Sequence, residues 1–216
     1  MHLFSVHVAK AGGTALRHSL AEAFGERLHL QYDDGPMNPA SLRNLDPARS
    51  VAGLFRPPED TACTHGHYHP GRFRIDQEDI LFALLRPPVD NIISIYFFWK
   101  TFRAEGNPLH DYFMREALTI RDFARLPLVR SLYSFSYFGG FDMGRFDILG
   151  DYRNRASAIA RLSAAIGHPL ASEERLNVTA PSEERQAVEA DEALKADLRD
   201  ILIEDIRFFE RHAEGR

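Results

Sequence analysis

The stretch that decides the fold lies between residues 3 and 24 and has the sequence LFSVHVAKAGGTALRHSLAEAF. Residues 3–8 are apolar and rich in β-formers, which predicts a buried strand. From Leu16 to Phe24 the apolar residues recur at helical spacing, and we expect Gly25 to end that helix. A lysine and two adjacent glycines separate the strand from the helix, and this pattern favours an anion-binding loop.

The order of residues in this loop differs from that of a nucleotide P-loop, in which Lys follows the last Gly and directly precedes Ser or Thr. Here Lys10 comes before Gly12 and Gly13. The glycines allow close approach of the backbone to a ligand, and the amides of Gly13, Thr14 and Ala15 would open the helix toward an anion. Lys10 adds a mobile charge. A plain turn with a solvated lysine is the alternative.

Further strands and helices alternate along the chain. Strands are expected at 28–32, 51–55, 62–64, 79–85 and 146–149, and helices after Pro87, at 153–166 and at 182–213, with short helices in 107–145. This alternation predicts an α/β fold, a three-layer sandwich with a central parallel sheet and helices on both faces. We expect a single domain over 1–216. Lys10 and Arg86 both follow predicted strands, so they are expected at the same rim of the sheet, where ligands bind.

A second anion site is predicted in the segment LLRPPVDNIISIYFFWK, residues 84–100. Arg86 stands at a strand end, and Ser94 lies off the apolar stripe of the following helix, on a side that can face Arg86. An arginine with a nearby hydroxyl suits a phosphate. A salt-bridged arginine and a surface serine form the alternative.

Alternating histidines occur at 65, 67 and 69. Their spacing matches no standard zinc pattern, so we predict no metal site. A neutral imidazole can accept a proton from a hydroxyl near pH 7, which makes a general base the better functional interpretation. His67 is the first choice and His65 the second. Asp33 and Asp34 are a weaker source of a base, because an acidic pair in a turn explains them better. Buried or surface histidines without a function are the other alternative.

Composition limits the function classes. The 216-residue chain has a net charge of −5, which argues against general nucleic-acid binding. Cys63 is the only cysteine, so no internal disulfide can form. The first apolar run is too short for a signal peptide, and no stretch approaches the roughly 20 apolar residues of a membrane span. We therefore expect a cytoplasmic protein; its oligomeric state is not readable.

Taken together, these segments resemble a known enzyme family. VHVAKAGGTAL (6–16) is similar to the 5′-phosphosulfate loop of sulfotransferases that use 3′-phosphoadenosine 5′-phosphosulfate (PAPS), and LLRPPVDNIISIYFFW (84–99) is similar to their 3′-phosphate motif. The carbohydrate branch, with its heparan sulfate 2-O- and chondroitin-type enzymes, also carries a Gly-His pair before the arginine motif, here Gly66-His67. Segments 146–167 and 175–184 resemble the same branch. Asp151 directly follows Gly150, where that branch usually has a Glu two or three residues after the Gly.

The resemblance implies an activity and a cofactor. PAPS would bind through Lys10, Gly12, Gly13, Thr14 and Ala15 at its 5′ end and through Arg86 and Ser94 at its 3′-phosphate. The acceptor hydroxyl, on a small molecule or a glycan, would attack sulfur, and adenosine 3′,5′-bisphosphate (PAP) would leave. Lys10 would stabilise the bridging oxygen, His67 would take the proton, and the fold would be P-loop-like.

Two other functions stay open. A nucleotide-dependent phosphotransferase on the same fold would need a lysine after the glycines and an acidic Mg²⁺ ligand, for which Asp151 is a candidate. A non-catalytic protein that binds a nucleotide or a sulfated ligand would keep the same sheet without turnover. The resemblance implies metal-independent sulfuryl transfer, and the loop agrees with it, because the Ser or Thr next to Lys that binds Mg²⁺ in a P-loop is absent.

Overall fold

A parallel sheet forms the centre of the protein. The computed structural model describes residues 1–102, 106–171 and 182–213. Within them, neighbouring strands are all parallel and lie in the order β2-β3-β1-β4-β5. The strands are β1 (Leu3–Val6), β2 (Leu28–Gln31), β3 (Cys63–Gly66), β4 (Ile80–Leu85) and β5 (Ile148–Asp151).

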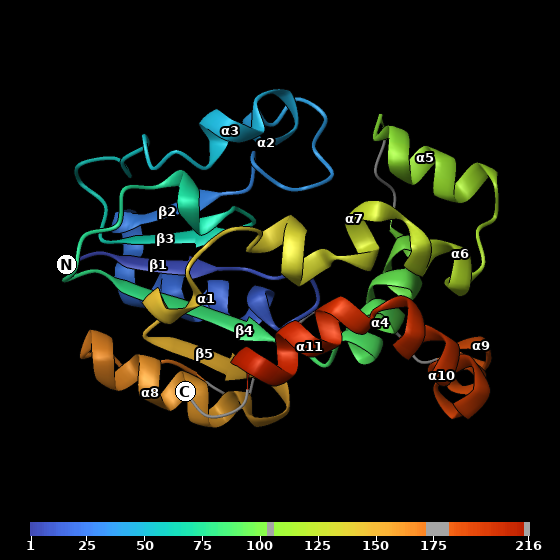
Figure 1. The fold of residues 1–216 in the computed structure, drawn as a ribbon. Helices are drawn as coiled ribbons and strands as arrows, with labels where there is room; N and C mark the ends of the chain where they lie inside the picture. The colour runs from blue at the N-terminus through green and yellow to red at the C-terminus, as the bar shows by residue number, and fades with distance from the viewer. Residues whose placement is uncertain (103–105, 172–181, 214–216) are drawn as a thin grey trace.

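Helices cover both faces of the sheet (Figure 1). One face packs on α1 (Gly13–Phe24) and α8 (Arg155–Ile166): a Cβ added to Gly150 of β5 would lie 2.5 Å from Ala158 of α8. The other face carries the segment before β5 together with α11 (Ile203–His212), where the Phe138 and Phe208 rings stack with their centroids 5.8 Å apart. The predicted α/β class with a central parallel sheet is therefore confirmed.

The connections of the sheet diverge between β1 and β4, which are neighbours. The chain leaves β1 toward β2 on one side and leaves β4 toward β5 on the other. In open parallel sheets, the crevice beyond the carboxyl ends of two such strands is where ligands bind. Lys10 follows β1 and Arg86 follows β4, so the topology brings both cations to this crevice.

A group of helices lies beyond the carboxyl ends of the strands (Figure 1). It includes α4 (Pro88–Thr101), α5 (Pro108–Arg115), α6 (Ile120–Arg125), α7 (Pro127–Arg130), a π-helix (Leu132–Tyr137), α9 (Glu183–Ala190) and α10 (Glu192–Ile201). Helix α4 packs against α6, α9 and α10. No helix in the described parts of the chain is long and apolar enough to span a lipid bilayer.

Two predicted elements are wrong. Residues 51–55 form no strand; Gly53 has φ +64°, and Phe55 makes only an isolated bridge to Phe73, after the short helices α2 (Leu42–Leu45) and α3 (Pro47–Ser50). The single helix predicted over 182–213 is three helices. The chain is extended at Asp191, whose carboxylate caps α10 through the Leu194 amide at 2.9 Å, and α10 ends before Leu202, which has φ −97° and ψ 16°. Most of the segment 175–184 (175–181) lies outside the described residues.

Candidate active site

The loop between β1 and α1 has an unusual backbone. Lys10 has φ +59° and Gly12 has φ +84°, so the backbone of both residues is in the left-handed conformation. Gly13 has no room for a side chain, since an added Cβ would lie 1.8 Å from the His7 ring. The N-cap of α1 is Gly12, which cannot cap with a side chain, and the first turn of the helix contains no acidic residue. The amides that open α1 therefore suit a bound anion.

Two cations meet beside this loop. The Arg86 Nη1 donates to the Lys10 carbonyl at 3.3 Å, and the Arg86 guanidinium lies 5.2 Å from the centroid of the Tyr152 ring. The Lys10 ammonium lies 4.5 Å from the centroid of the Phe98 ring. Burial lowers the pKa of Lys10, and the nearby Arg86 and Arg185 lower it further. An anion bound between these cations would offset their repulsion.

The π-helix holds both cation-bearing loops in place. The Tyr133 hydroxyl accepts from the Arg86 amide at 3.3 Å and donates to the Arg86 carbonyl at 2.7 Å. The Tyr137 hydroxyl accepts from the Ala9 amide at 3.2 Å. The buried Asp205 of α11 accepts from the Tyr133 amide at 2.9 Å, which anchors the π-helix itself. These hydrogen bonds fix the backbone of both loops.

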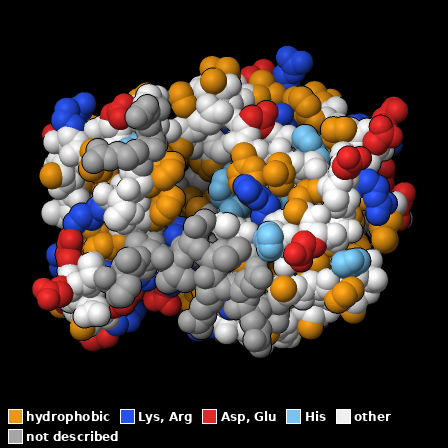
Figure 2. Space-filling model, turned by 180° about the vertical axis from the view of Figure 1, so that it is seen from behind, with side chains coloured by type: hydrophobic (Ala, Val, Ile, Leu, Met, Phe, Trp, Pro, Cys, Tyr) orange, Lys and Arg blue, Asp and Glu red, His pale blue; other side chains and the backbone are white. Residues whose placement is uncertain are grey.

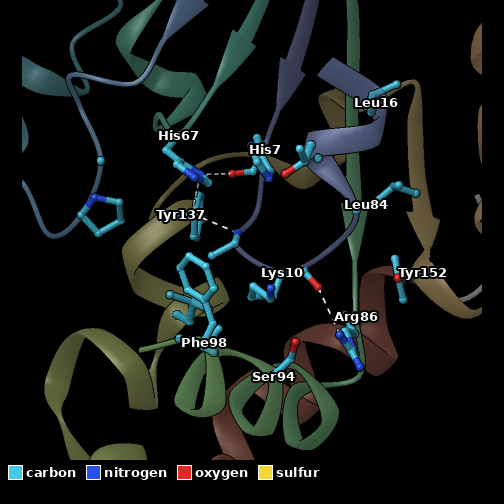
Figure 3. Close-up of a pocket in the computed structure, with 18 of the residues that line it drawn as sticks. His7, Lys10, Leu16, His67, Leu84, Arg86, Ser94, Phe98, Tyr137 and Tyr152 are labelled. Atoms are coloured by element: carbon cyan, nitrogen blue, oxygen red, sulfur yellow. Dashed lines mark hydrogen bonds between the residues drawn. The ribbon is translucent and has the colours of Figure 1, made fainter. Parts of the chain in front are cut away.

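Helix α4 adds a third anchor and a hydroxyl. The Asn91 side-chain amide donates to the Ala9 carbonyl at 2.8 Å. One turn later, Ser94 lines the same cleft as Lys10 and Arg86, and its hydroxyl hydrogen-bonds none of the described residues. Figure 3 shows the Ser94 hydroxyl directed toward the space between the two cations.

His67 lies across the cleft from Arg86, just beyond the end of β3 (Figure 3). Its Nδ1 makes a short hydrogen bond to the His7 carbonyl and also lies 3.0 Å from the Tyr137 hydroxyl. A carbonyl oxygen can only accept, so Nδ1 carries the proton and Nε2 keeps its lone pair. None of the described residues hydrogen-bonds Nε2. The side chain therefore presents a proton acceptor at the cleft.

Burial keeps this imidazole neutral. Although one edge of the ring reaches the cleft, desolvation lowers the pKa of His67 to about 4, and Arg43 lowers it further, while the hydrogen bond to His7 opposes the shift. The His7 ring stacks on it with centroids 4.2 Å apart, and the His7 Nδ1 lies 2.9 Å from the Tyr32 hydroxyl. Burial also lowers the pKa of His7.

The second histidine lies elsewhere. His65 is fully buried on the α1 side of the sheet, its Nδ1 is 2.9 Å from the Ser5 hydroxyl, and it does not line this cleft. Burial lowers its pKa to about 3. Strand β3 stops at Gly66, so His65 and His67 do not share a strand face.

The acidic pair lies outside the cleft as well. Asp33 is exposed, whereas Asp34 is buried and pairs with Arg72 at 3.0 Å and with Arg43 at 3.6 Å. This makes Asp34 a structural residue. In the described residues, no three His, Cys, Asp or Glu side chains are grouped to hold a metal ion.

A single large cleft, about 1460 Å³ in volume, joins these groups. The candidate residues that line it are Lys10, Gly12, Gly13, Thr14, Ala15, His67, Arg86 and Ser94. In Figure 3, Lys10 lies between His67 with Tyr137 on one side and Arg86 with Ser94 on the other. The cleft therefore offers two cationic positions and a neutral imidazole along one path.

The comparisons with known proteins give a distant likeness among solved structures. No protein-family model matches the chain, and no curated protein matches it. Among solved structures it is similar to mouse sulfotransferase SULT7A1 complexed with PAP, with 10% sequence identity and a TM-score of 0.36. That alignment covers 94% of this chain, which spans 64% of the length of the mouse protein chain.

Several residues of the site were not predicted from the sequence. His7 stacks on His67, and Asn91 and Tyr137 hold the loop at Ala9. One signal was present for Asn91: it lies three residues before Ser94 on α4, and side chains three residues apart lie on the same face of a helix. No local signal marks Tyr137, which meets Ala9 from 128 residues away.

Proposed function

We propose that the protein is a PAPS-dependent sulfotransferase that moves a sulfuryl group to an acceptor hydroxyl. The observation that carries the proposal is the sharing of one cleft by the Lys10 loop, Arg86 and the neutral His67. A linear donor with an anionic group at each end needs two separate cationic positions, here the Lys10 loop and Arg86. The hydroxyl that attacks the sulfur needs a proton acceptor beside the Lys10 loop.

The residues of the loop fit a phosphosulfate. The amides at the start of α1 and the left-handed backbone of Lys10 and Gly12 provide donors for anionic oxygens. Arg86 and Ser94 would hold the 3′-phosphate, because a guanidinium and a hydroxyl are both donors to phosphate oxygens. We take these residues to act within one sulfotransferase-like domain, and we expect a cytoplasmic location.

The reaction is an in-line displacement. The acceptor oxygen forms a bond to sulfur while the bond between sulfur and the bridging oxygen breaks and PAP leaves. The proton of the acceptor hydroxyl passes to the Nε2 of His67, whose other nitrogen is held by the His7 carbonyl. Lys10 stabilises the negative charge that develops on the bridging oxygen. This scheme assigns no step to a metal ion.

Thermal denaturation with added nucleotides tests the donor. We expect PAP to raise Tm in the presence of a chelator, and adenosine 5′-phosphosulfate, which lacks the 3′-phosphate, to raise it less. Stabilisation by ATP with Mg²⁺ alone would instead support a phosphotransferase. If neither PAP nor adenosine 5′-phosphosulfate changes Tm, the proposed cofactor is wrong.

A transfer assay with sulfur-35-labelled PAPS tests the activity. The acceptors include glycans, because the sequence resemblance implies a carbohydrate acceptor, together with lipids and small alcohols. Labelled product from any of them supports sulfuryl transfer. Tight binding of PAP without transfer to any acceptor would support the non-catalytic alternative.

A further inference from the structure

The cleft is larger than one nucleotide site requires. Ligand pockets usually enclose about 300–1,000 Å³, whereas this cleft encloses about 1460 Å³. The anion-binding groups occupy the side near Arg86. Part of the remaining space lies beyond His67 and Lys10, where residues from 32–39, 106–109 and 128–137 line the cleft and an acceptor would meet the proposed base.

The character of the cleft wall changes along α4. Asp90 and Ser94, in the first half of the helix, line the part near Arg86, whereas Ile95, Phe98 and Phe102 line the cleft further on. At about 1.5 Å of rise per residue, Ile95 and Thr101, the last residue of α4, are separated by about 9 Å along the helix axis. The second half of α4 thus provides an apolar wall of that length, which Phe102 extends just beyond the helix.

Residues from distant segments form the opposite wall. Met37, Leu109 and Leu128 line the cleft, and each is partly exposed. We call the space between them and Ile95, Phe98 and Phe102 the apolar arm. Figure 2 shows a hollow near the middle of this face of the molecule, with hydrophobic side chains on its rim.

The amide side chains of the arm are already engaged with the backbone. Asn107 donates to the Met37 carbonyl at 2.8 Å and accepts from the His110 amide at 3.1 Å. Asn38 donates to the Asp33 carbonyl at 2.6 Å and accepts from the Ala40 amide at 3.0 Å. A sugar ring would need such groups for its own hydroxyls, but here Asn107 joins two segments of the wall and Asn38 bonds within its own loop.

The opposite wall also lacks charge. Among the described residues, those that line the cleft from 32–39, 106–109 and 128–137 include no Lys, Arg, Asp or Glu. An anionic glycan would need cations along this wall to replace the water it loses. An uncharged apolar body would instead bury its surface at no such cost.

From this contrast we infer that the acceptor is an uncharged amphipathic alcohol or phenol, with its hydroxyl at His67 and its hydrocarbon body in the apolar arm. The inference rests on the proposed sulfuryl transfer and departs from the glycan class that the sequence resemblance implies. The products would be the sulfate ester of the acceptor and PAP, with the acceptor proton on His67.

The experiment uses 4-n-alkylphenols with ethyl, butyl and hexyl chains, a matched series of unbranched alcohols, and uncharged and anionic oligosaccharides. Initial rates of sulfur-35 transfer are measured with saturating PAPS. We expect kcat/KM to rise by up to roughly fourfold for each added methylene that the arm buries. The phenol and alcohol series distinguish aromatic from aliphatic bodies. A flat series, or a higher kcat/KM for an oligosaccharide, would overturn the inference while leaving sulfuryl transfer intact.

Two variants place the effect in the arm. Met37→Gln and Leu109→Asn should lower kcat/KM for hexylphenol by roughly tenfold, because each adds an amide that burial by the alkyl chain would desolvate. Ethylphenol, which reaches less of the arm, should be affected less. Met114→Gln is the control, since Met114 is exposed on α5 outside the cleft. Equal losses for both phenols, or a loss in the control, would contradict the assignment.

Equilibrium binding separates failure of this inference from failure of the proposed function. Hexylphenol is titrated calorimetrically into the wild type and the two variants in the presence of PAP, and also without it. Binding that weakens in Met37→Gln and Leu109→Asn supports the arm even if no sulfate is transferred. If hexylphenol does not bind the wild type, the inference is wrong, whatever PAP does.

Discussion

The two ends of the cleft are built in opposite ways. At the anion-binding end, Lys10 and Arg86 each follow a strand of the sheet, and hydrogen bonds from Tyr133 and Tyr137 fix the backbone around them. In the apolar arm, side chains from α4 line one wall of the cleft, and Met37, Leu109 and Leu128 line the other. These three residues come from loops and short helices outside the sheet.

This difference suggests a division of roles. The rigid end suits a ligand of fixed shape and charge, because preorganised donors stabilise charge at little cost in reorganisation. The arm recognises only hydrocarbon, whose burial is not directional. Variants at one end should therefore change binding at the other end far less, even for Lys10, whose ammonium lies 4.5 Å from the centroid of the Phe98 ring of the arm. The predictions below test this from the largest expected effect to the smallest.

His67→Ala should give the largest loss, because His67 lies where the two ends meet. We expect kcat to fall by roughly 10²–10⁴-fold, the usual contribution of a general base. Binding of PAP should persist, because His67 lies outside the proposed anion-binding groups, and hexylphenol should lose only the hydrogen bond from its hydroxyl to Nε2. His18→Ala is the matched control, since His18 is exposed on α1. Unchanged turnover in His67→Ala would exclude His67 as the base.

Lys10→Ala should affect the rate and the anion-binding end together. Loss of one group that stabilises transition-state charge typically lowers kcat by about 10²–10³-fold, and the affinity for PAPS should fall as well. Lys100→Ala is the control, because Lys100 pairs with Glu184 on the surface. Kinetics with saturating and limiting PAPS separate the two effects. A variant that binds hexylphenol more weakly by a similar factor would break the proposed independence of the ends.

Arg86→Ala should act mainly on the donor. A charge-assisted hydrogen bond contributes about 1.5–3 kcal/mol, so the Kd for PAP should rise by roughly 10–150-fold while kcat at saturating PAPS changes less. Calorimetric titration of PAP measures this, with Arg74→Ala as the control because Arg74 is exposed. Adenosine 5′-phosphosulfate should lose little affinity in Arg86→Ala. An equal loss for both nucleotides would place the 3′-phosphate elsewhere.

Acidification should have the smallest effect. Burial lowers the pKa of His67 from its ordinary 6.5 to about 4, so the free enzyme keeps the proton-accepting form as the pH falls to about 5 and loses it only near 4. From pH 7.5 to 5.5, kcat/KM should change by less than about twofold on account of this group. An imidazole with a pKa of 6.5 would lose roughly tenfold by pH 5.5. The pH–rate profile for ethylphenol distinguishes the two.

The same contrast explains how much was predictable from the sequence. Lys10, Gly12, Gly13 and Arg86 were placed correctly at the rim of the sheet, because the ends of parallel strands meet and the flanking strands carry clear apolar patterns. Residues 51–55 have a strand-like pattern but no strand beside them, which no local rule detects.

The rest depends on contacts between distant segments. His65 and His67 differ because β3 ends between them, and strand ends are poorly determined by local sequence. The walls of the arm could not be assigned from sequence, because Met37 and Leu128 look like ordinary apolar residues until the fold brings them together.

The left-handed backbone at Lys10 lowers the stability of the fold, whereas its ammonium group serves the binding of an anion. An L-residue with a side chain pays roughly 1–2 kcal/mol to hold that conformation, whereas glycine holds it freely. In a library of variants sorted only for resistance to heat, Lys10→Gly should therefore be enriched, although it removes the ammonium group from the cleft. Improving the protein as a scaffold would then erase its anion-binding end, and any engineering campaign has to select for ligand binding at the same time.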